Sequence, residues 1–256
     1  MTNTTIPKAV ENFLAKQGLT ALDLKAVLID MDGVLFDSMP IHAYTWNKTI
    51  AEEGLHMSEE EAYLHEGRTG RSTIEIVFRK HLHRDPTEEE VKRIYGKKAG
   101  LFDSMPEAPV MEGAPALLDT IASQGLIRVL VTGSGQKLLL NRVNHHFPGH
   151  FSSDLMVTAF DVTRGKPHPE PFLKGMQKAG AQAHQALVIE NAPLGVEAAK
   201  AAGLFTIAVN TGPLNDTHLN KADLIFHNLN ELILAWPELM RSCREISLPG
   251  HNCRKP

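Results

Sequence analysis

Short apolar runs alternate with amphipathic segments along most of this chain, and this alternation restricts the possible folds more than any other feature. The runs have the length of strands and lie at residues 26–29, 128–131, 155–158, 186–189 and 205–209. Helical patterns separate them, which is typical of βαβ units. Strands connected in this way form a parallel sheet with helices on both faces. The sequence therefore predicts an α/β fold built on a doubly wound parallel sheet.

The alternation stops between Met39 and Pro109, where the pattern is helical throughout. Capping boxes at Ser58–Glu61 and Thr87–Glu90 mark helix starts inside this segment. Because connections that contain proline lie at both of its borders, we expect an inserted helical cap domain that moves on a hinge. The expected division is an N-terminal extension with a short helix at 1–20, a core at 21–38 and 109–240, the cap at 39–108, and a disordered tail at 241–256.

Composition favours a soluble globular protein without a nucleic-acid or membrane partner. The 256 residues are 43% hydrophobic, which is enough for one large core and a smaller module. A formal net charge of −4 provides no overall basic field for nucleic acid. No apolar stretch has the length of a membrane span, and the first residues lack the pattern of a secretory signal. We expect a cytoplasmic protein that is a monomer or a homodimer.

Two carboxylates, Asp30 and Asp32, follow the first apolar run, and Gly33 comes directly after them. Parallel strands present their carboxyl ends to ligands, so this pair is placed for a nucleophile beside a magnesium ion. Taken alone, the pair fits an ordinary solvated strand exit equally well.

The loops after the next strands carry the other groups that phosphoryl transfer requires. Thr132, Gly133 and Ser134 offer hydroxyls and exposed amides to phosphoryl oxygens. Lys166 lies in a turn stiffened by prolines, and the pair Glu190-Asn191 precedes a helix start. A nucleophile, a cation, a metal ligand and hydrogen-bond donors at one sheet edge are the elements of a phosphoryl-transfer site.

With these residues in place, the chain resembles the haloacid dehalogenase superfamily, and within it the β-phosphoglucomutase-like group. The resemblance extends from about Lys25 to about Leu234. The family's signatures occur in order at 30–34, 131–134, 166–167 and 188–191. The resemblance implies a Rossmann-like core with a mobile cap.

The resemblance also assigns roles to individual residues. Asp30 would be the nucleophile that forms an aspartyl-phosphate, and Asp32 the acid/base whose backbone carbonyl also reaches Mg²⁺. Thr132 and Lys166 would bind the transferring phosphoryl group, and Glu190 would help to hold the metal.

Two features favour the inorganic pyrophosphatase branch of this group. Many relatives have Glu-Asp in the last signature, whereas this chain has Glu190-Asn191. The segment around Glu66 resembles the cap loop of that branch, in which a cap glutamate reaches the magnesium of the closed site. A cap residue on the metal leaves room only for a small, highly charged substrate such as pyrophosphate. The other interpretation of Glu66 is a solvated carboxylate at a helix end.

A β-phosphoglucomutase remains the alternative. Such an enzyme needs a cation that holds a distal phosphate, and this chain has Gly135-Gln136 after the second signature. Arg68 and Arg71 offer substitutes, but they fit exposed surface positions equally well. His42 either orients Asp32 or the substrate, or lies on a polar helix face. Asn191 either binds substrate or caps a helix.

Overall fold

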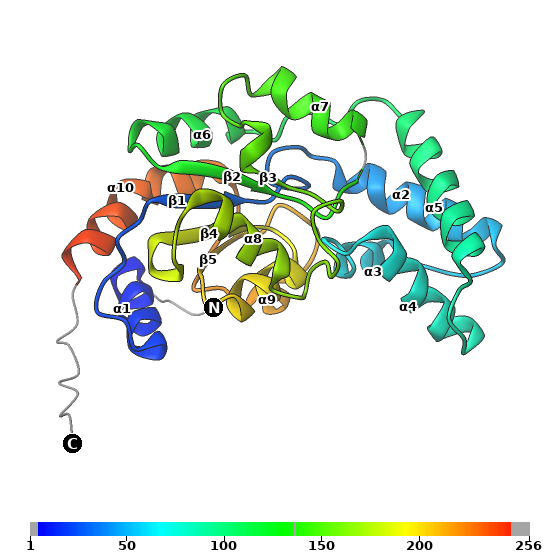
Figure 1. The fold of residues 1–256 in the computed structure, drawn as a ribbon, viewed down its shortest axis with the longest axis horizontal. Helices are drawn as coiled ribbons and strands as arrows, with labels where there is room; N and C mark the ends of the chain where they lie inside the picture. The colour runs from blue at the N-terminus through cyan, green and yellow to red at the C-terminus, as the bar shows by residue number, and fades with distance from the viewer. Residues whose placement is uncertain (1–4, 136, 247–256) are drawn as a thin grey trace.

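The structure, a computed structural model, describes residues 5–135 and 137–246. Its core is a six-stranded parallel sheet in the order β3-β2-β1-β4-β5-β6 (Figure 1), so the predicted doubly wound sheet is confirmed. The strands are β1 (Ala26–Ile29), β2 (Ile127–Val131), β3 (Met156–Val157), β4 (Ala186–Glu190), β5 (Phe205–Val209) and β6 (Leu224–Phe226).

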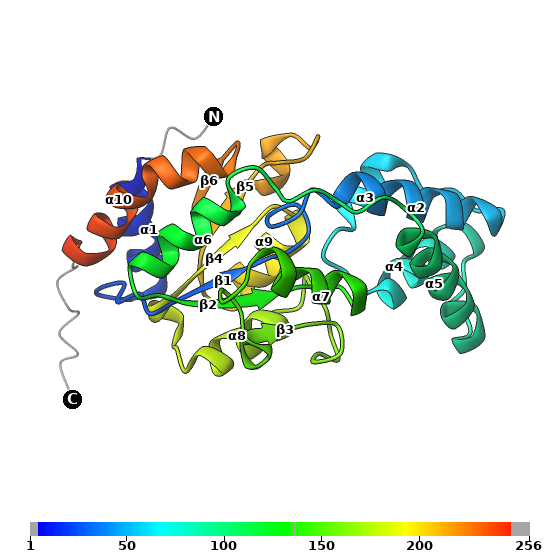
Figure 2. The same cartoon turned by 90° about the horizontal axis from the view of Figure 1, so that it is seen from above.

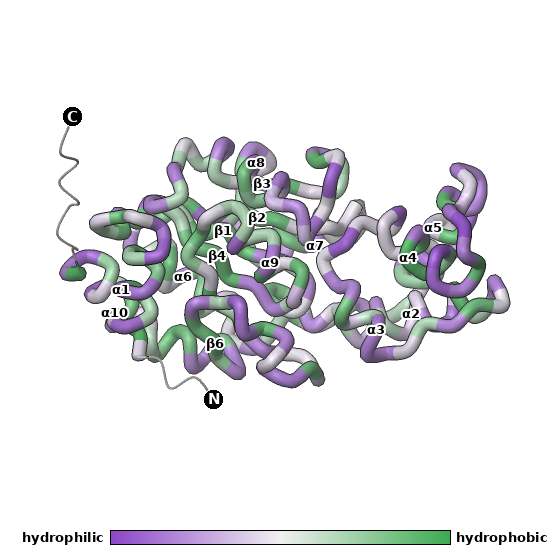
Figure 3. Tube along the Cα trace, turned by 90° about the horizontal axis from the view of Figure 1, so that it is seen from below, coloured by the Kyte–Doolittle hydropathy of each residue, from purple (hydrophilic) through white to green (hydrophobic). Residues whose placement is uncertain are grey.

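Helices cover both faces of the sheet because alternate strand residues point to opposite sides. On one face, α8 (Glu170–Ala179) packs on β1 and β2, and α9 (Pro193–Ala201) packs on β4 and β5. The other face is covered by α1 (Ile6–Gln17), α6 (Ala114–Ser123), α7 (Lys137–His146) and α10 (Leu229–Glu245). The strands in the middle of the core are the most apolar segments in Figure 3.

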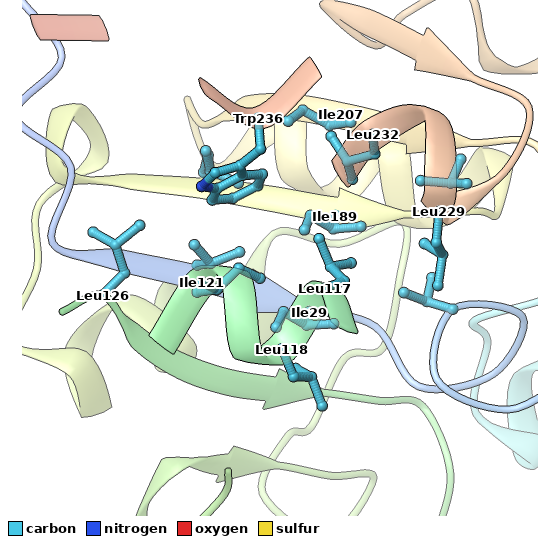
Figure 4. Close-up of a cluster of buried hydrophobic side chains, with 14 of the residues drawn as sticks. Ile29, Leu117, Leu118, Ile121, Leu126, Ile189, Ile207, Leu229, Leu232 and Trp236 are labelled. Carbon is cyan, nitrogen blue, oxygen red and sulfur yellow. The ribbon is translucent and has the colours of Figure 1, made fainter. Parts of the chain in front are cut away.

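The larger apolar cluster lies on the second face, between the sheet and α6 and α10. Figure 4 shows Trp236 and Leu232 of α10 and Ile121 of α6 in one cluster with strand residues such as Ile29 and Ile189. All of these side chains are fully buried. Each large apolar side chain buried in this way contributes roughly 1.5–3 kcal/mol, so this cluster gives the loops at the sheet edge a rigid support.

Strand register brings the predicted site residues to one edge. Ile29 of β1 is paired with Leu130 of β2 on one side and with Ile189 of β4 on the other. The backbone N–H of Asp30 extends the second pairing by donating to the Ile189 carbonyl at 3.0 Å. The residues that follow these three strands therefore meet at the same carboxyl edge, as expected for parallel strands.

Four helices form the cap beyond that edge (Figures 1 and 2), and these are α2 (Met39–Glu52), α3 (Glu59–Leu64), α4 (Gly70–Leu82) and α5 (Glu88–Asp103). They share an apolar cluster of their own around Trp46 and Ile74. Both predicted capping boxes are present, at Ser58–Glu61 and Thr87–Glu90. The two chain crossings between core and cap run side by side, since the Asp37 N–H donates to the Pro109 carbonyl at 2.9 Å.

The chain ends differ in part from expectation. The helix expected in the N-terminal extension is α1, which packs against α10. The expected disordered tail at 241–256 is wrong for its first part, because α10 continues to Glu245 and buries Cys243 against the core. An apolar stripe at helical spacing therefore continues past the predicted boundary. The rest of the expected tail, 247–256, lies outside the described residues.

We predict opposite effects on stability for two glycine substitutions in helices. A Cβ at Gly175 of α8 would lie 2.8 Å from Leu28 Cδ2 and 3.1 Å from Val131 Cγ2, whereas one at Gly96 of α5 meets nothing within 4 Å. Gly175→Ala should lower the free energy of unfolding by about 1–3 kcal/mol through overpacking. Gly96→Ala should raise it by about 0.5–1 kcal/mol through helix propensity. Urea denaturation measures both, and equal effects would contradict the packing described for α8.

Candidate active site

A buried lysine links two of the strand-end carboxylates. Lys166 comes from the loop before α8, and its Nζ forms ion pairs with Asp30 and Glu190. It also donates to the Val131 carbonyl at 3.2 Å. Burial alone would lower the pKa of Lys166, but the two carboxylates raise it above its ordinary value. The lysine therefore carries a permanent positive charge beside the predicted nucleophile, where a phosphoryl group would need it.

Asp30 lies in an environment short of positive charge. Burial raises its pKa well above the ordinary value, Lys166 opposes this rise, and the charges of Glu190 and Asp32 add to it. A carboxylate in that position is reactive as a nucleophile only when further cations hold it ionised.

Glu190 is held in place by the backbone that follows it. Its Oε2 accepts hydrogen bonds from the N–H groups of Asn191 and Ala192 at 2.8 and 2.7 Å. A Cβ at Gly195 would overlap the carboxylate, because it would lie 1.7 Å from Oε1. The glycine in this signature therefore provides the space that the Glu190 carboxylate occupies.

The second predicted carboxylate, Asp32, lies in a tight turn and faces the cap. Its Oδ1 accepts a hydrogen bond from Ser38 Oγ at 2.6 Å and lies 3.3 Å from His42 Nε2. Burial would raise the pKa of Asp32, but His42 and Ser38 outweigh it and lower the pKa. Of the two interpretations of His42, the structure shows the one in which it orients Asp32.

A lysine that the sequence analysis did not identify continues this chain of contacts. Lys98 of α5 is buried, and its Nζ lies 2.7 Å from His42 Nδ1. Burial lowers the pKa of Lys98 to about 7. The His42 ring stacks on Phe102 at a centroid distance of 4.4 Å, which fixes its orientation. The available signal was a lysine on the buried stripe of α5, between Ile94 and Phe102.

The cap reaches the core site through Glu66. This residue lies in the turn after α3 and is 8% exposed, and its Oε1 accepts a hydrogen bond from Asn191 Nδ2 at 2.8 Å. Burial raises its pKa well above the ordinary value, and Asp30 and Glu190 add to the rise. Glu66 is therefore a buried side chain at the site, and the solvated alternative is wrong. Asn191 contacts the cap through this bond.

The loop after β2, residues 132–135, is the predicted phosphate-binding loop, and it touches the same cap turn. Thr132 is buried, and its Oγ1 accepts the backbone N–H of Ser134 at 3.0 Å. A Cβ at Gly133 would lie 2.5 Å from the Gly67 carbonyl oxygen. Only glycine permits this approach, so the loop and the cap enclose the site together.

A partly open cavity of about 70 Å³ lies between these groups. Asp30, Asp32, Gly133 and Ser134 line it from the core, and Glu66 and Arg68 line it from the cap. Arg71 does not line it, because its guanidinium is paired with Glu88 on the surface. Of the two arginines considered from the sequence, only Arg68 faces this cavity.

Tyr95 of α5, also missed in the sequence, reduces the volume of the cavity. A Cβ at Gly70 would lie 2.2 Å from both Cδ2 and Cε2 of the Tyr95 ring, so the ring packs directly against this glycine. Its hydroxyl accepts a hydrogen bond from the backbone N–H of Gly135 in the phosphate-binding loop. The tyrosine therefore joins cap to core at the edge of the cavity.

The donors at this edge fit a hard divalent cation. Asn191 Oδ1 is buried without a hydrogen-bond partner, and the charges of Asp30 and Glu190 add to the raised pKa of Glu66. No three His, Cys, Asp or Glu side chains in residues 5–135 and 137–246 form a ready-made metal cage. Mg²⁺ does not need one, since it keeps several waters and binds through one or two carboxylates and substrate phosphates.

Comparisons with known proteins identify the family. The model of the haloacid dehalogenase-like hydrolases matches residues 24–203. The chain belongs to this family. Hexitol phosphatase A of Escherichia coli is 31% identical over 209 residues, which cover 81% of this chain and 93% of that protein. A phosphorylated carbohydrates phosphatase of Thermotoga maritima is 29% identical over 195 residues, which cover 75% of this chain and 88% of that protein.

A solved structure agrees over nearly the whole chain. A provisional beta-phosphoglucomutase from Bacteroides vulgatus superposes with a TM-score of 0.91 at 52% identity, and it covers 95% of this chain and 100% of its own. The protein is therefore a member of the phosphatase and phosphoglucomutase-like part of the haloacid dehalogenase-like hydrolases. No helix in the described part of the chain is long and apolar enough to cross a membrane.

We predict that Lys98 destabilises the folded state at low pH. Its pKa is about 7 when folded and about 10.4 when unfolded. The unfolded chain therefore binds more protons between these values, and stability rises with pH over this window. Lys98→Met should be more stable than wild type at pH 6, by a few kcal/mol at most, since one pKa unit corresponds to about 1.4 kcal/mol. The difference should shrink toward pH 10.

Lys97→Met is the matched control for this prediction, because Lys97 is exposed and pairs with Glu52 and Glu53 on the cap surface. Urea denaturation of both variants from pH 6 to 10 gives the two difference curves. A pH-independent difference for Lys98→Met would show that Lys98 is neutral or fully paired throughout.

Proposed function

We propose that this protein is a Mg²⁺-dependent phosphohydrolase whose substrate is inorganic pyrophosphate. The hydrogen bond between Glu66 and Asn191 is the observation that supports the proposal most strongly. It brings a cap carboxylate to the metal-ligand edge of the core when the cap is closed. The carboxylate occupies space that the organic part of a larger substrate would need.

The residues of the core suit a reaction in two steps through phosphorylated Asp30. In the first step, an Asp30 oxygen attacks the phosphorus atom, and Lys166 offsets the charge on the transferring oxygens. Thr132 and Ser134 donate to the same oxygens. The second phosphate leaves with a proton from Asp32 or as the free anion.

Hydrolysis of the aspartyl-phosphate follows with Asp32 as the base. Its carboxylate removes a proton from the attacking water, and the lowered pKa of Asp32 keeps it ionised for that purpose. His42 and Ser38 hold the carboxylate in position through their contacts with Oδ1. The transferred phosphoryl group is then released as orthophosphate, and Asp30 is free for another turnover.

The residues that would hold Mg²⁺ are Asp30, Glu190, Asn191 and Glu66, together with the Asp32 backbone carbonyl. When bound, the ion neutralises part of the phosphate charge and of the carboxylate excess. In this proposal Glu66 becomes one of the groups that hold the ion only after the cap closes. Closure of the cap is therefore coupled to the presence of the substrate and its metal.

The size of the cavity supports a small inorganic substrate. A volume of about 70 Å³ corresponds to roughly five water molecules at 10–15 Å³ each. Tyr95 and Glu66 both limit this volume from the cap side. Pyrophosphate is closer to this size than a sugar phosphate is.

A sugar phosphate is the second candidate, either as the substrate of a phosphatase or of a β-phosphoglucomutase. The names of the relatives favour it. Apolar side chains of the cap also line the cavity, namely Met39, Trp46 and Met57. Such a surface suits the face of a sugar ring better than an inorganic anion.

A substrate panel distinguishes the two candidates. We expect kcat/KM for pyrophosphate to exceed that for hexose and hexitol phosphates by about tenfold or more, which corresponds to about 1.4 kcal/mol. The activity should be lost on chelation of Mg²⁺. Release of orthophosphate is the measurement, with β-glucose 1-phosphate and a sugar bisphosphate activator included to detect mutase activity. Preference for a sugar phosphate would overturn the proposal.

Substitution of Tyr95 should change this preference. Tyr95→Ala removes the ring above Gly70 and enlarges the cavity, so the ratio of kcat/KM for a hexose phosphate to that for pyrophosphate should rise about tenfold or more. Tyr95→Phe is the matched control, because it keeps the ring and loses only the contact with Gly135. An unchanged ratio in a folded Tyr95→Ala would show that the ring does not limit substrate size.

A further inference from the structure

A groove on the outer surface separates the start of α4 from the core loop before α8. Residues 163–169 line it from the core, and the residues that line it from the cap are Arg68, Thr69, Arg71, Ser72 and Glu75. Lys166 belongs to the core wall, so the groove borders the phosphate-binding lysine. The groove therefore lies directly behind the catalytic site.

Arg68 connects the two spaces, since it lines both the cavity and the groove. It has no carboxylate partner among the described residues. Its Nη1 donates to Ser72 Oγ at a long 3.4 Å, and its buried Nε has no hydrogen-bond partner. Glu197 is the acidic side chain that acts on its charge from a distance. A half-buried arginine with free donors is an anion-binding group.

The other charged groups of the groove leave an excess of positive charge. Arg164 has no ion-pair partner in the described part of the chain, and only its backbone N–H is bonded, to Glu170. His168 Nδ1 accepts the backbone N–H of Glu170 at 3.1 Å, so its Nε2 carries a proton and can donate.

The acidic side chains near the groove already have ion-pair or hydrogen-bond partners. Glu75 lies between Arg71 and Arg79, 4.0 Å from each guanidinium. The Glu170 carboxylate accepts backbone N–H groups of the loop and pairs with Lys174. Because these carboxylates are neutralised, an incoming anion meets the cations of the groove.

We infer that this groove is a second anion site, which binds the orthophosphate that the reaction releases. Arg68, Arg164 and His168 all line the groove and supply charged and neutral donors of the kind that bind phosphate. The cap and core touch along the same seam, where a Cβ at Gly165 would lie 2.8 Å from Thr69 Cγ2. A small opening of the seam would therefore deliver phosphate from Lys166 past Arg68 into the groove. The inference requires phosphohydrolase chemistry only, and holds for pyrophosphate and sugar phosphates alike.

The test measures phosphate binding while the catalytic site is occupied. Trifluoroberyllate with Mg²⁺ imitates the phosphoryl group on Asp30, and fluorine NMR shows when this site is saturated. Calorimetric titration with inorganic phosphate should then reveal one further equivalent bound. Arg68→Gln and Arg164→Gln should each weaken this binding by about tenfold or more, the effect of losing a hydrogen bond to a charged group. Arg84→Gln, a cap arginine paired with Glu90 outside the groove, is the control and should bind like wild type.

Arg164→Gln separates the groove from the catalytic cavity. It should leave kcat/KM unchanged, because Arg164 lines only the groove. If Arg68→Gln weakens phosphate binding and Arg164→Gln does not, the anion lies inside the cavity and the groove site is excluded. Absence of a second phosphate, or equal binding in all variants, also overturns the inference. None of these measurements uses pyrophosphate. A negative result therefore contradicts the second anion site without contradicting pyrophosphate as the proposed substrate.

Discussion

The ion pairs of Lys166 with Asp30 and Glu190 organise the catalytic edge of this protein. All three side chains are almost completely buried, and loss of one partner from a buried ion pair costs about 3–5 kcal/mol. The predicted nucleophile, the predicted phosphate-binding lysine and the predicted metal-ligand carboxylate are thus held by one interaction between β1, β4 and the loop before α8. Addition of Glu66 from the cap leaves more carboxylates than cations. That excess is the physical reason to expect a divalent cation at this edge.

The cap adds side chains to this edge and also limits the space above it. Glu66 and Tyr95 each contact the core, through Asn191 and Gly135, and each occupies space above the phosphate-binding loop. Glycines at 67, 70 and 133 permit these close approaches. In the proposed function, the same contacts that close the site limit the size of the leaving group and connect a closed cap with a small substrate.

Much of this arrangement could be predicted from the sequence, because parallel strands align their carboxyl ends by geometry. Asp30, Thr132 and Glu190 follow three adjacent strands, so their convergence needed only the βαβ pattern. Lys98 and Tyr95 were missed because their positions depend on how the cap docks on the core. No local sequence pattern predicts how the cap docks on the core. Arg68 and Arg71 are three residues apart, and only the structure distinguishes them, because Arg68 lines the cavity whereas Arg71 pairs with Glu88.

The central claim is that Glu66 acts on bound substrate and metal when the cap is closed. Calorimetric titration with pyrophosphate and Mg²⁺ of Asp30→Asn, which binds without turnover, tests it directly. The account predicts that adding Glu66→Gln to this variant weakens binding by about tenfold or more, while adding the surface substitution Glu60→Gln has no effect. Equal affinity in all three proteins would contradict the account and would make Glu66 a structural contact between cap and core.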